Sequence, residues 1–225
     1  MKTAIVAGAT GLVGSSLVRT LLEDESFSKI VAFTRRSADI NHPRFREYIV
    51  DFNRMSDWGS LITGDVLFSA MGTTRAKSGS KEAQFKVDYT YQFEMARIAA
   101  MNKVPVMVLV SAYGANPKSP SFYMSMKGKL DTDLVSLGFE SLNILRPGAL
   151  DGKRNEQRNL EELAVKGLHL LNRIGILKSY LPIPGHTVAA AMIEIFKNAK
   201  HGVHIHNHLS LFELASQYLH AKVQP

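Results

Sequence analysis

The stretch TAIVAGATGLVG, residues 3–14, decides how this chain folds. It joins a short apolar run, typical of a buried strand, to a turn in which Gly8, Gly11 and Gly14 recur at every third position. Glycines at this spacing permit a tight turn, a close approach of the backbone to a pyrophosphate, and close packing of the next helix on the strand. The residues after the turn have a helical pattern, and the first N–H groups of such a helix point at the phosphates. The stretch predicts a dinucleotide-binding strand, turn and helix.

Short β-branched segments alternate with longer helical patterns along the rest of the chain. We expect strands at 3–9, 29–34, 46–52, 65–71, 104–112, 141–147 and 202–207. Several of these segments are apolar nearly throughout, as strands covered by helices on both faces are. The pattern predicts an α/β fold with a Rossmann-like, doubly wound parallel sheet and helices on both faces. The length of 225 residues favours a single domain over 1–225.

The segment 151–185 interrupts this alternation with a charged stretch, an amphipathic pattern and the turn-rich LPIPG. Extra material after a late strand of a doubly wound sheet lies beside the carboxyl ends of the strands, where ligands bind. We interpret the segment as a small C-terminal insertion on the substrate side that acts as a lid. A packing or dimerisation helix is the alternative, and 157–174 could supply the two-fold interface of a homodimer.

The overall composition restricts the partners of the protein. The chain has no cysteine, so disulfides, a thiol nucleophile and thiolate metal ligands are excluded. This fits a reducing compartment, and we expect a cytoplasmic protein. The sequence has no run of 18 or more apolar residues, which argues against a membrane span. The net charge is +7, but the basic residues are scattered, which favours an anionic cofactor over nucleic acid.

Two adjacent arginines, Arg35 and Arg36, follow the second expected strand. NAD-binding folds commonly place an acidic residue there, which accepts a hydrogen bond from the 2′-hydroxyl of the adenosine ribose. A 2′-phosphate would be repelled by that carboxylate, whereas arginine offers phosphate a planar fork of donors. We therefore predict NADP(H) as the cofactor, with solvated loop residues as the alternative. Asp51, after the third strand, is a candidate partner of the adenine amino group or, equally, a turn cap ahead of Asn53.

Hydride-transfer chemistry is predicted by a set of three residues that follow the fifth expected strand. Ser111 lies at the expected carboxyl end of that strand, and Tyr123 and Lys127 follow at helical spacing i and i+4, which puts them on one face. An ammonium group stabilises a nearby phenolate, so such a tyrosine can exchange a proton with a carbonyl or alcohol oxygen. We expect Lys127 also to hold the nicotinamide ribose and Ser111 to polarise the substrate oxygen. A second Y-x-x-x-K, at Tyr218, has no glycine turn or strand-end serine near it and is interpreted as accidental.

Together these features resemble the short-chain dehydrogenase/reductase superfamily. Several longer segments are more closely similar to its atypical, Tat-interacting oxidoreductase-like branch. They are MGTTRAKSGS (71–80), FKVDY (85–89), YMSMKGKLD, LRPGAL and the R-N-E-Q-R stretch. The resemblance implies one NADPH-binding domain and makes Tyr123 the proton acceptor. It further implies cofactor contacts at Thr10, Gly11, Leu12, Val13, Arg35, Arg36, Met71, Gly72, Tyr123, Lys127, Leu150 and Arg158. Relatives often have two adjacent serines at this strand end, whereas this sequence has Ser111 followed by alanine. The role of polarising the substrate therefore rests on Ser111 alone.

The leading hypothesis is therefore an NADPH-dependent reductase of a small carbonyl compound. The family also includes members known for binding and regulation, so a non-catalytic NADPH sensor is the alternative. A nucleotide-sugar epimerase or dehydratase uses the same triad, but commonly carries a further sugar-nucleotide domain. His204, His206 and His208 alternate, which we interpret as a polar face at a sheet edge rather than as metal ligands, and we predict no metal site.

Overall fold

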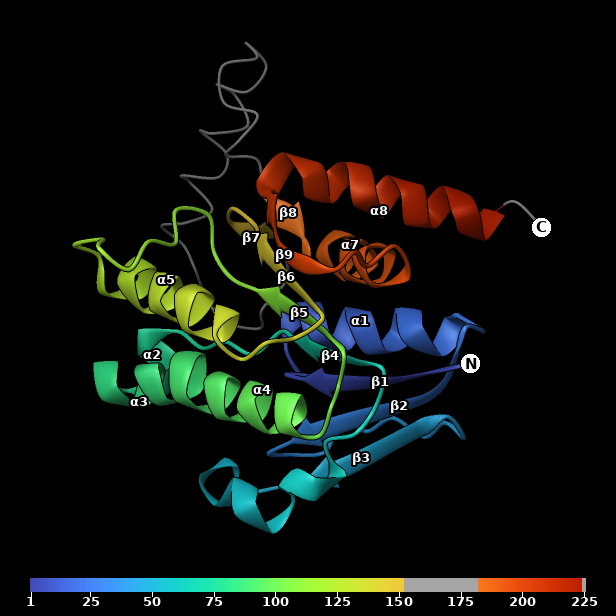
Figure 1. Ribbon diagram of the computed structural model, residues 1–225, viewed down its shortest axis with the longest axis horizontal. Helices are drawn as coiled ribbons and strands as arrows, with labels where there is room; N and C mark the ends of the chain where they lie inside the picture. The colour runs from blue at the N-terminus through green and yellow to red at the C-terminus, as the bar shows by residue number, and fades with distance from the viewer. Residues whose placement is uncertain (152–181, 224–225) are drawn as a thin grey trace.

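The computed structural model describes residues 1–151 and 182–223 (Figure 1). A seven-stranded sheet has the order β3-β2-β1-β4-β5-β6-β9, and every neighbouring pair is parallel. Its strands are β1 (Lys2–Ala7), β2 (Phe27–Thr34), β3 (Phe45–Ile49), β4 (Val66–Ser69), β5 (Val106–Val110), β6 (Ser141–Arg146) and β9 (Gly202–Asn207). The seven expected strands are all present: five of them are shorter than expected, β2 begins two residues earlier, and β9 has the expected bounds. The predicted Rossmann-like α/β fold is confirmed.

Helices cover both faces of this sheet because its central strands are apolar on both sides. On β1, Ala4 and Val6 face one hydrophobic core and Ile5 and Ala7 face the other. The first core is closed by α1 (Leu12–Glu23), α7 (Gly185–Lys197) and α8 (His208–Val223). The second is closed by α4 (Tyr91–Met101), α5 (Phe122–Val135) and the short 3₁₀ helix η1 (Phe52–Asp57), together with Trp58 and Ile62 on either side of the 3₁₀ helix η2 (Gly59–Leu61). Figure 1 shows these two helical layers on opposite sides of the strands.

The strand order reverses between β1 and β4. The chain runs outward from β1 through β2 to β3, and then returns to β4 on the other side of β1. In open parallel sheets this reversal separates the loops at the carboxyl ends of the two central strands, and ligands bind there. The loops that follow β1, β2, β3, β4 and β5 carry most of the predicted site residues, so the fold brings them to one edge.

One long helical stretch before β5 is interrupted by a π-helical turn. After the short α2 (Arg75–Ser78), this stretch is built from α3 (Lys81–Phe85), the π turn η3 (Lys86–Thr90) and α4. Single π turns inside α-helices are rare and are often found at functional sites. The helical pattern of the sequence did not indicate this turn.

Only the two ends of the predicted insertion belong to the described residues. Leu150 and Asp151 form β7, which pairs in parallel with Ile183 and Pro184 of β8, and the Ile183 N–H donates to Ala149 O at 2.8 Å. The predicted lid or dimerisation helix, and Arg158 with it, lie outside the described residues. Among the helices that are described, none is both long enough and apolar enough to cross a membrane.

Candidate functional site

The glycine turn is packed so closely that only glycine fits at two of its positions. Gly8 has φ of +87°, and a Cβ there would lie 2.6 Å from Ala70 O and 2.8 Å from Met71 N. A Cβ on Gly14 would lie 2.0 Å from Gly8 O, which fixes α1 directly against the turn. Gly11 is the N-cap of α1 and offers no side chain to its first N–H groups, and the first turn has no acidic residue. These N–H groups and the bare backbone suit an anionic group such as a pyrophosphate.

The remaining predicted cofactor contacts on this unit lie at the same turn. Thr10 is exposed, Leu12 is half-buried and Val13 is buried in the core under α1. The β4 loop reaches the turn through Ala70 and Met71, so Met71 and Gly72 adjoin the predicted pyrophosphate position. Leu150 lies in β7, beyond the carboxyl end of β6.

Arg35 and Arg36 are both exposed directly after β2, beside the carboxyl end of β1. Their turn is shaped by Glu47, a residue that sequence reasoning did not single out. The Glu47 carboxylate accepts hydrogen bonds from Thr34 Oγ1 at 2.8 Å and from the Ala38 N–H at 2.9 Å, one on each side of the arginine pair. Within the described residues neither arginine has an ion-pair partner. The strand end therefore presents two positive charges to solvent, as a 2′-phosphate site requires.

Asp51 has the capping role that the sequence left open as an alternative. Its Oδ1 accepts from the Asn53 N–H and from Asn53 Nδ2, both at 2.8 Å, at the start of η1. The Asn53 backbone bond is the main reason that the pKa of Asp51 lies below its ordinary value. Contact with adenine stays a prediction, since Asp51 is exposed at the end of β3 on the same sheet edge.

The loop after β4 is held by three buried polar side chains spaced four residues apart. Gln84, Asp88 and Gln92 are 6%, 1% and 1% exposed. Asp88 Oδ2 accepts from the Thr73 N–H at 3.0 Å, and the Cβ position of Gly72 lies 3.3 Å from Asp88 Oδ1. Ser69 Oγ donates to Gln92 Oε1 at 2.8 Å, and Gln84 Nε2 donates weakly to Thr73 O at 3.5 Å. We call Gln84, Asp88 and Gln92 the polar ladder; it fixes the backbone from Ser69 to Thr73.

Tyr123 and Lys127 lie on α5, whose first turn is capped by Ser121 Oγ. Tyr123 is half-buried, whereas the Lys127 side chain is only 2% exposed and its Nζ donates to Val110 O at 3.1 Å, at the end of β5. Burial lowers the pKa of Lys127, and the carboxylates of Asp88 and Asp131 act in the opposite direction. The predicted pair therefore includes a buried lysine whose amine is bound to the end of β5.

Ser111 does not point to an exposed part of the sheet edge. Its Oγ and Asp131 Oδ1 are both buried and neither makes a hydrogen bond of normal geometry. Burial raises the pKa of the Asp131 carboxyl, whereas the Ser111 hydroxyl and Arg146 act to lower that pKa. Ser111 and the Asp131 carboxylate are therefore near neighbours. Arg146 donates to Asp131 Oδ2 from Nε at 3.0 Å and from Nη2 at 2.9 Å.

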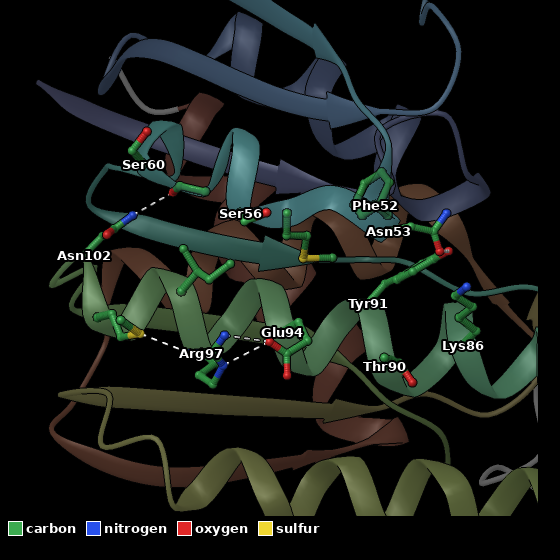
Figure 2. Close-up of a pocket in the computed structure, with 14 residues that line it drawn as sticks. Phe52, Asn53, Ser56, Ser60, Lys86, Thr90, Tyr91, Glu94, Arg97 and Asn102 are labelled. Carbon is green, nitrogen blue, oxygen red and sulfur yellow. Dashed lines mark hydrogen bonds and ion pairs between the residues drawn. The ribbon is translucent and has the colours of Figure 1, made fainter.

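A cavity of about 740 Å³ lies away from these residues, between η1, η2 and α4 (Figure 2). Figure 2 shows the Tyr91 hydroxyl meeting Asn53 at one end and the Arg97–Glu94 ion pair on its α4 side. None of the predicted catalytic residues lines this cavity. Only its Asn53 end lies near Asp51, the predicted partner of adenine. We therefore locate the candidate site by the strand-end loops and not by this cavity.

The alternating histidines have separate protein partners. His206 Nε2 lies 3.1 Å from Asn143 Oδ1, and His208 Nδ1 accepts from the Gly148 N–H at 2.9 Å. The part of the chain that the structure describes holds no group of three or more metal-binding side chains.

Comparison with known proteins shows the family. The HIM1 family model matches residues 45–181, which is more than half of the chain. "Protein FMP52, mitochondrial" of Candida albicans is 40% identical over 163 residues, covering 70% of this chain and 71% of the relative. The chain belongs to the HIM1/FMP52 family. Its Saccharomyces cerevisiae relative of the same name is 38% identical over 159 residues, with 68% of each chain covered.

Solved structures agree with the fold at low sequence identity. The Bordetella bronchiseptica enzyme WbmH, in complex with NAD⁺, has a TM-score of 0.69 and 16% identity, covering 100% of this chain and 82% of its own. A short-chain dehydrogenase/reductase from Saccharomyces cerevisiae has a TM-score of 0.69 and 15% identity, covering 95% and 99%. This HIM1/FMP52 chain therefore shares the Rossmann-like α/β fold of these solved structures.

The expectation of a cytoplasmic protein is wrong. The FMP52 relatives from Candida albicans, Kluyveromyces lactis, Saccharomyces cerevisiae and Aspergillus fumigatus are all named mitochondrial. The prediction rested on the missing cysteines, which report the redox conditions a chain tolerates and not the compartment to which it is delivered.

Proposed function

We propose that the protein is an NADP(H)-dependent oxidoreductase that reduces a carbonyl group in a small-molecule substrate, within the atypical short-chain dehydrogenase/reductase branch that its sequence resembles. The convergence of the glycine turn, the Arg35–Arg36 pair and the Tyr123–Lys127 pair at one sheet edge carries this proposal. We also propose, from the names of its relatives, that the protein acts in mitochondria.

The cofactor site is assigned to the loops that follow the first four strands. The first N–H groups of α1 and the bare backbone at Gly8 and Gly14 accommodate the pyrophosphate. Arg35 and Arg36 bind the 2′-phosphate through charge-assisted hydrogen bonds and cover the adenine face. Met71 and Gly72 adjoin the glycine turn from the β4 loop, and the polar ladder gives them a fixed backbone on which the cofactor can lie.

A bound nicotinamide cofactor supplies the hydride. Tyr123 donates its phenolic proton to the carbonyl oxygen during reduction, and it takes that proton back in the reverse direction. The ammonium of Lys127 favours the phenolate that remains, because an opposite charge nearby stabilises the ionised form. Ser111 Oγ is buried beside Asp131, so polarisation of the substrate by Ser111 requires its hydroxyl to rotate toward the sheet edge.

Replacement of one hydroxyl tests the assignment. We expect Tyr123→Phe to reduce turnover of a carbonyl substrate by on the order of 100-fold or more, because the proton donor is lost. NADPH affinity should change less than about threefold, since the phenyl ring keeps the packing. Tyr113→Phe is the matched control: Tyr113 is 41% exposed and lies on the loop before α5, and its loss should leave turnover unchanged.

The measurement is NADPH oxidation with a panel of aldehydes, ketones and quinones, together with NADPH binding by cofactor fluorescence. Unchanged turnover in Tyr123→Phe would contradict the catalytic assignment. Tight NADPH binding by the wild-type protein with no turnover on any member of the panel would favour the regulatory, non-catalytic alternative.

A further inference from the structure

The two edges of the sheet are built differently. β3 and β9 are the edge strands, at opposite ends of the sheet (Figure 1). On β3 the side chain of Arg46 is exposed, and Pro43 lies just before the strand. Charged residues and proline at an edge hinder its pairing with a strand of another chain. β9, of sequence GVHIHN, contains no lysine, arginine, acidic residue or proline, so it has none of this protection.

The outer edge of β9 keeps its main-chain hydrogen-bonding groups open. The strand pairs in parallel with β6 on one side only. Within the described ranges 1–151 and 182–223, no other strand or loop makes a backbone hydrogen bond to the outer edge at 203–206. An edge of this kind is a template for a further extended strand, which supplies the missing donors and acceptors.

Two β-branched side chains of β9 are exposed on one face of the sheet. Val203 and Ile205 are in register with Leu142 and Ile144 of β6, so all four side chains point to the face that α4 and α5 cover. Leu142 and Ile144 are 2% and 1% exposed, whereas Val203 and Ile205 are 47% and 50% exposed. The helices on this face therefore leave the last strand uncovered, and burial of its apolar surface by a partner is favourable.

The opposite face of β9 is occupied by histidines that already have partners in the chain. His206 Nε2 lies 3.1 Å from Asn143 Oδ1, and His204 Nε2 lies 3.2 Å from the carbonyl oxygens of Lys200 and His201. The features that remain to recognise a partner are the open main chain and the pair formed by Val203 and Ile205.

This strand is complementary to a second copy of itself. A two-fold axis perpendicular to the sheet pairs two identical edge strands in the antiparallel direction, and each face of one sheet continues into the same face of the other. When the axis passes between the two copies of His204, Val203 of each copy lies directly opposite Ile205 of the other. Opposed β-branched side chains stabilise antiparallel pairs. Because 202–207 has no lysine, arginine or acidic residue, the pairing brings no like charges together on the strand.

We propose that β9 is the surface on which two copies of this protein associate, edge to edge, so that two seven-stranded sheets become one continuous sheet. Main-chain hydrogen bonds supply the association, and Val203 and Ile205 of both copies form its apolar centre. The proposal goes beyond the proposed function and does not depend on it, because neither cofactor binding nor turnover enters the argument.

Sedimentation equilibrium of the full chain at micromolar concentrations measures the association. The wild-type protein should have twice the mass of one chain. Ile205→Lys places an ammonium group in the apolar centre of the paired strands, and it should give the mass of one chain at the same concentrations. Ile49→Lys is the matched control, because Ile49 is an isoleucine that is 64% exposed on the other edge strand, β3; this variant should remain a dimer.

A disulfide reports the register of the two strands. The chain contains no cysteine, so His204→Cys gives each copy a single thiol, and the two thiols lie directly opposite each other across the axis. Mild oxidation should link this variant into a covalent dimer. His206→Cys is the control on the same face: in the proposed register its two Cα atoms lie farther apart than the roughly 7 Å that a disulfide can span, so it should stay unlinked.

The outcomes are decisive in both directions. A wild-type protein with the mass of one chain at every concentration overturns the proposal and leaves the edge to a strand of a different protein. A dimer that Ile205→Lys leaves intact also overturns it, because the interface then lies elsewhere. If Ile205→Lys does not fold, as judged by circular dichroism, the disulfide experiment decides: no covalent dimer in His204→Cys, or equal linking of His204→Cys and His206→Cys, overturns the proposal.

Discussion

Asp24 ties three helices together, and its replacement gives a pH-dependent loss of stability. The carboxylate lies just after α1 and is 6% exposed. It pairs with Lys197 Nζ of α7 at 2.8 Å and accepts from the Tyr218 hydroxyl of α8 at 2.9 Å and from Ser26 Oγ at 2.6 Å. Burial raises the pKa of Asp24, but Lys197, Ser26 and Tyr218 outweigh it and lower the pKa to about 2.

The magnitude follows from linkage. The difference between the ordinary 3.8 and about 2 corresponds to about 2 kcal/mol at neutral pH, at 1.36 kcal/mol per pKa unit. The Lys197 side chain is 36% exposed, so solvent screening reduces the expected loss in Asp24→Asn to about 1–2 kcal/mol. Since the folded-state pKa is depressed, this stability is fully present above about pH 4 and is lost as the pH falls toward 2; about half should be gone at pH 3.

Urea unfolding at pH 7, 5 and 3, followed by fluorescence of the buried Trp58, measures this loss. Glu23→Gln is the control, because Glu23 is 69% exposed in its pair with Lys222 and should contribute less than about 0.5 kcal/mol. Equal stability of Asp24→Asn and wild type at pH 7, or a difference as large at pH 3 as at pH 7, would refute the reasoning.

Two further predictions concern the cofactor site. Replacement of Arg35 and Arg36 by serine should weaken NADPH binding by about 10- to 100-fold with little effect on NADH binding, because charge-assisted hydrogen bonds to the 2′-phosphate are lost. Fluorescence titration measures both affinities, and Arg54→Ser is the control for loss of an exposed positive charge. An unchanged NADPH affinity would place the arginine pair outside the site. Gly14→Ala adds a Cβ 2.0 Å from Gly8 O, so it should cost about 1–3 kcal/mol of folding stability and abolish NADPH binding, measured by urea unfolding and the same titration. Full retention of both properties would show that the turn is not as tightly packed as described.

The fold was predictable because its signals are local. The strand, turn and helix at 3–23 combine an apolar run, glycines that allow no side chain, and a helical pattern, and each points to the same structure. Parallel strands buried on both faces leave near-continuous apolar runs, which are easily recognised. The second Y-x-x-x-K motif, at Tyr218, could also be distinguished from the first by its sequence context. In the structure Tyr218 is buried and its hydroxyl donates to Asp24.

The environment of Lys127 could not be predicted from the sequence in the same way. Gln84, Asp88 and Gln92 have the composition of a solvated helix face, although they face inward and bond the β4 loop. Their burial depends on a π turn and on the neighbouring loop, which are tertiary features. Ser111 illustrates the same limit: its place at a strand end was evident, but not that its hydroxyl lies beside Asp131. The spacing of Asp131 four residues after Lys127 was the one available signal.

The central claim, that this sheet edge binds NADP(H), is tested most directly by paired titrations of the purified wild-type protein with NADPH and NADH, followed by cofactor fluorescence. The account predicts that NADPH binds about tenfold more tightly or better, which corresponds to at least about 1.4 kcal/mol. Equal affinities would contradict the role of Arg35 and Arg36, and the absence of binding by either cofactor would contradict the proposed function itself.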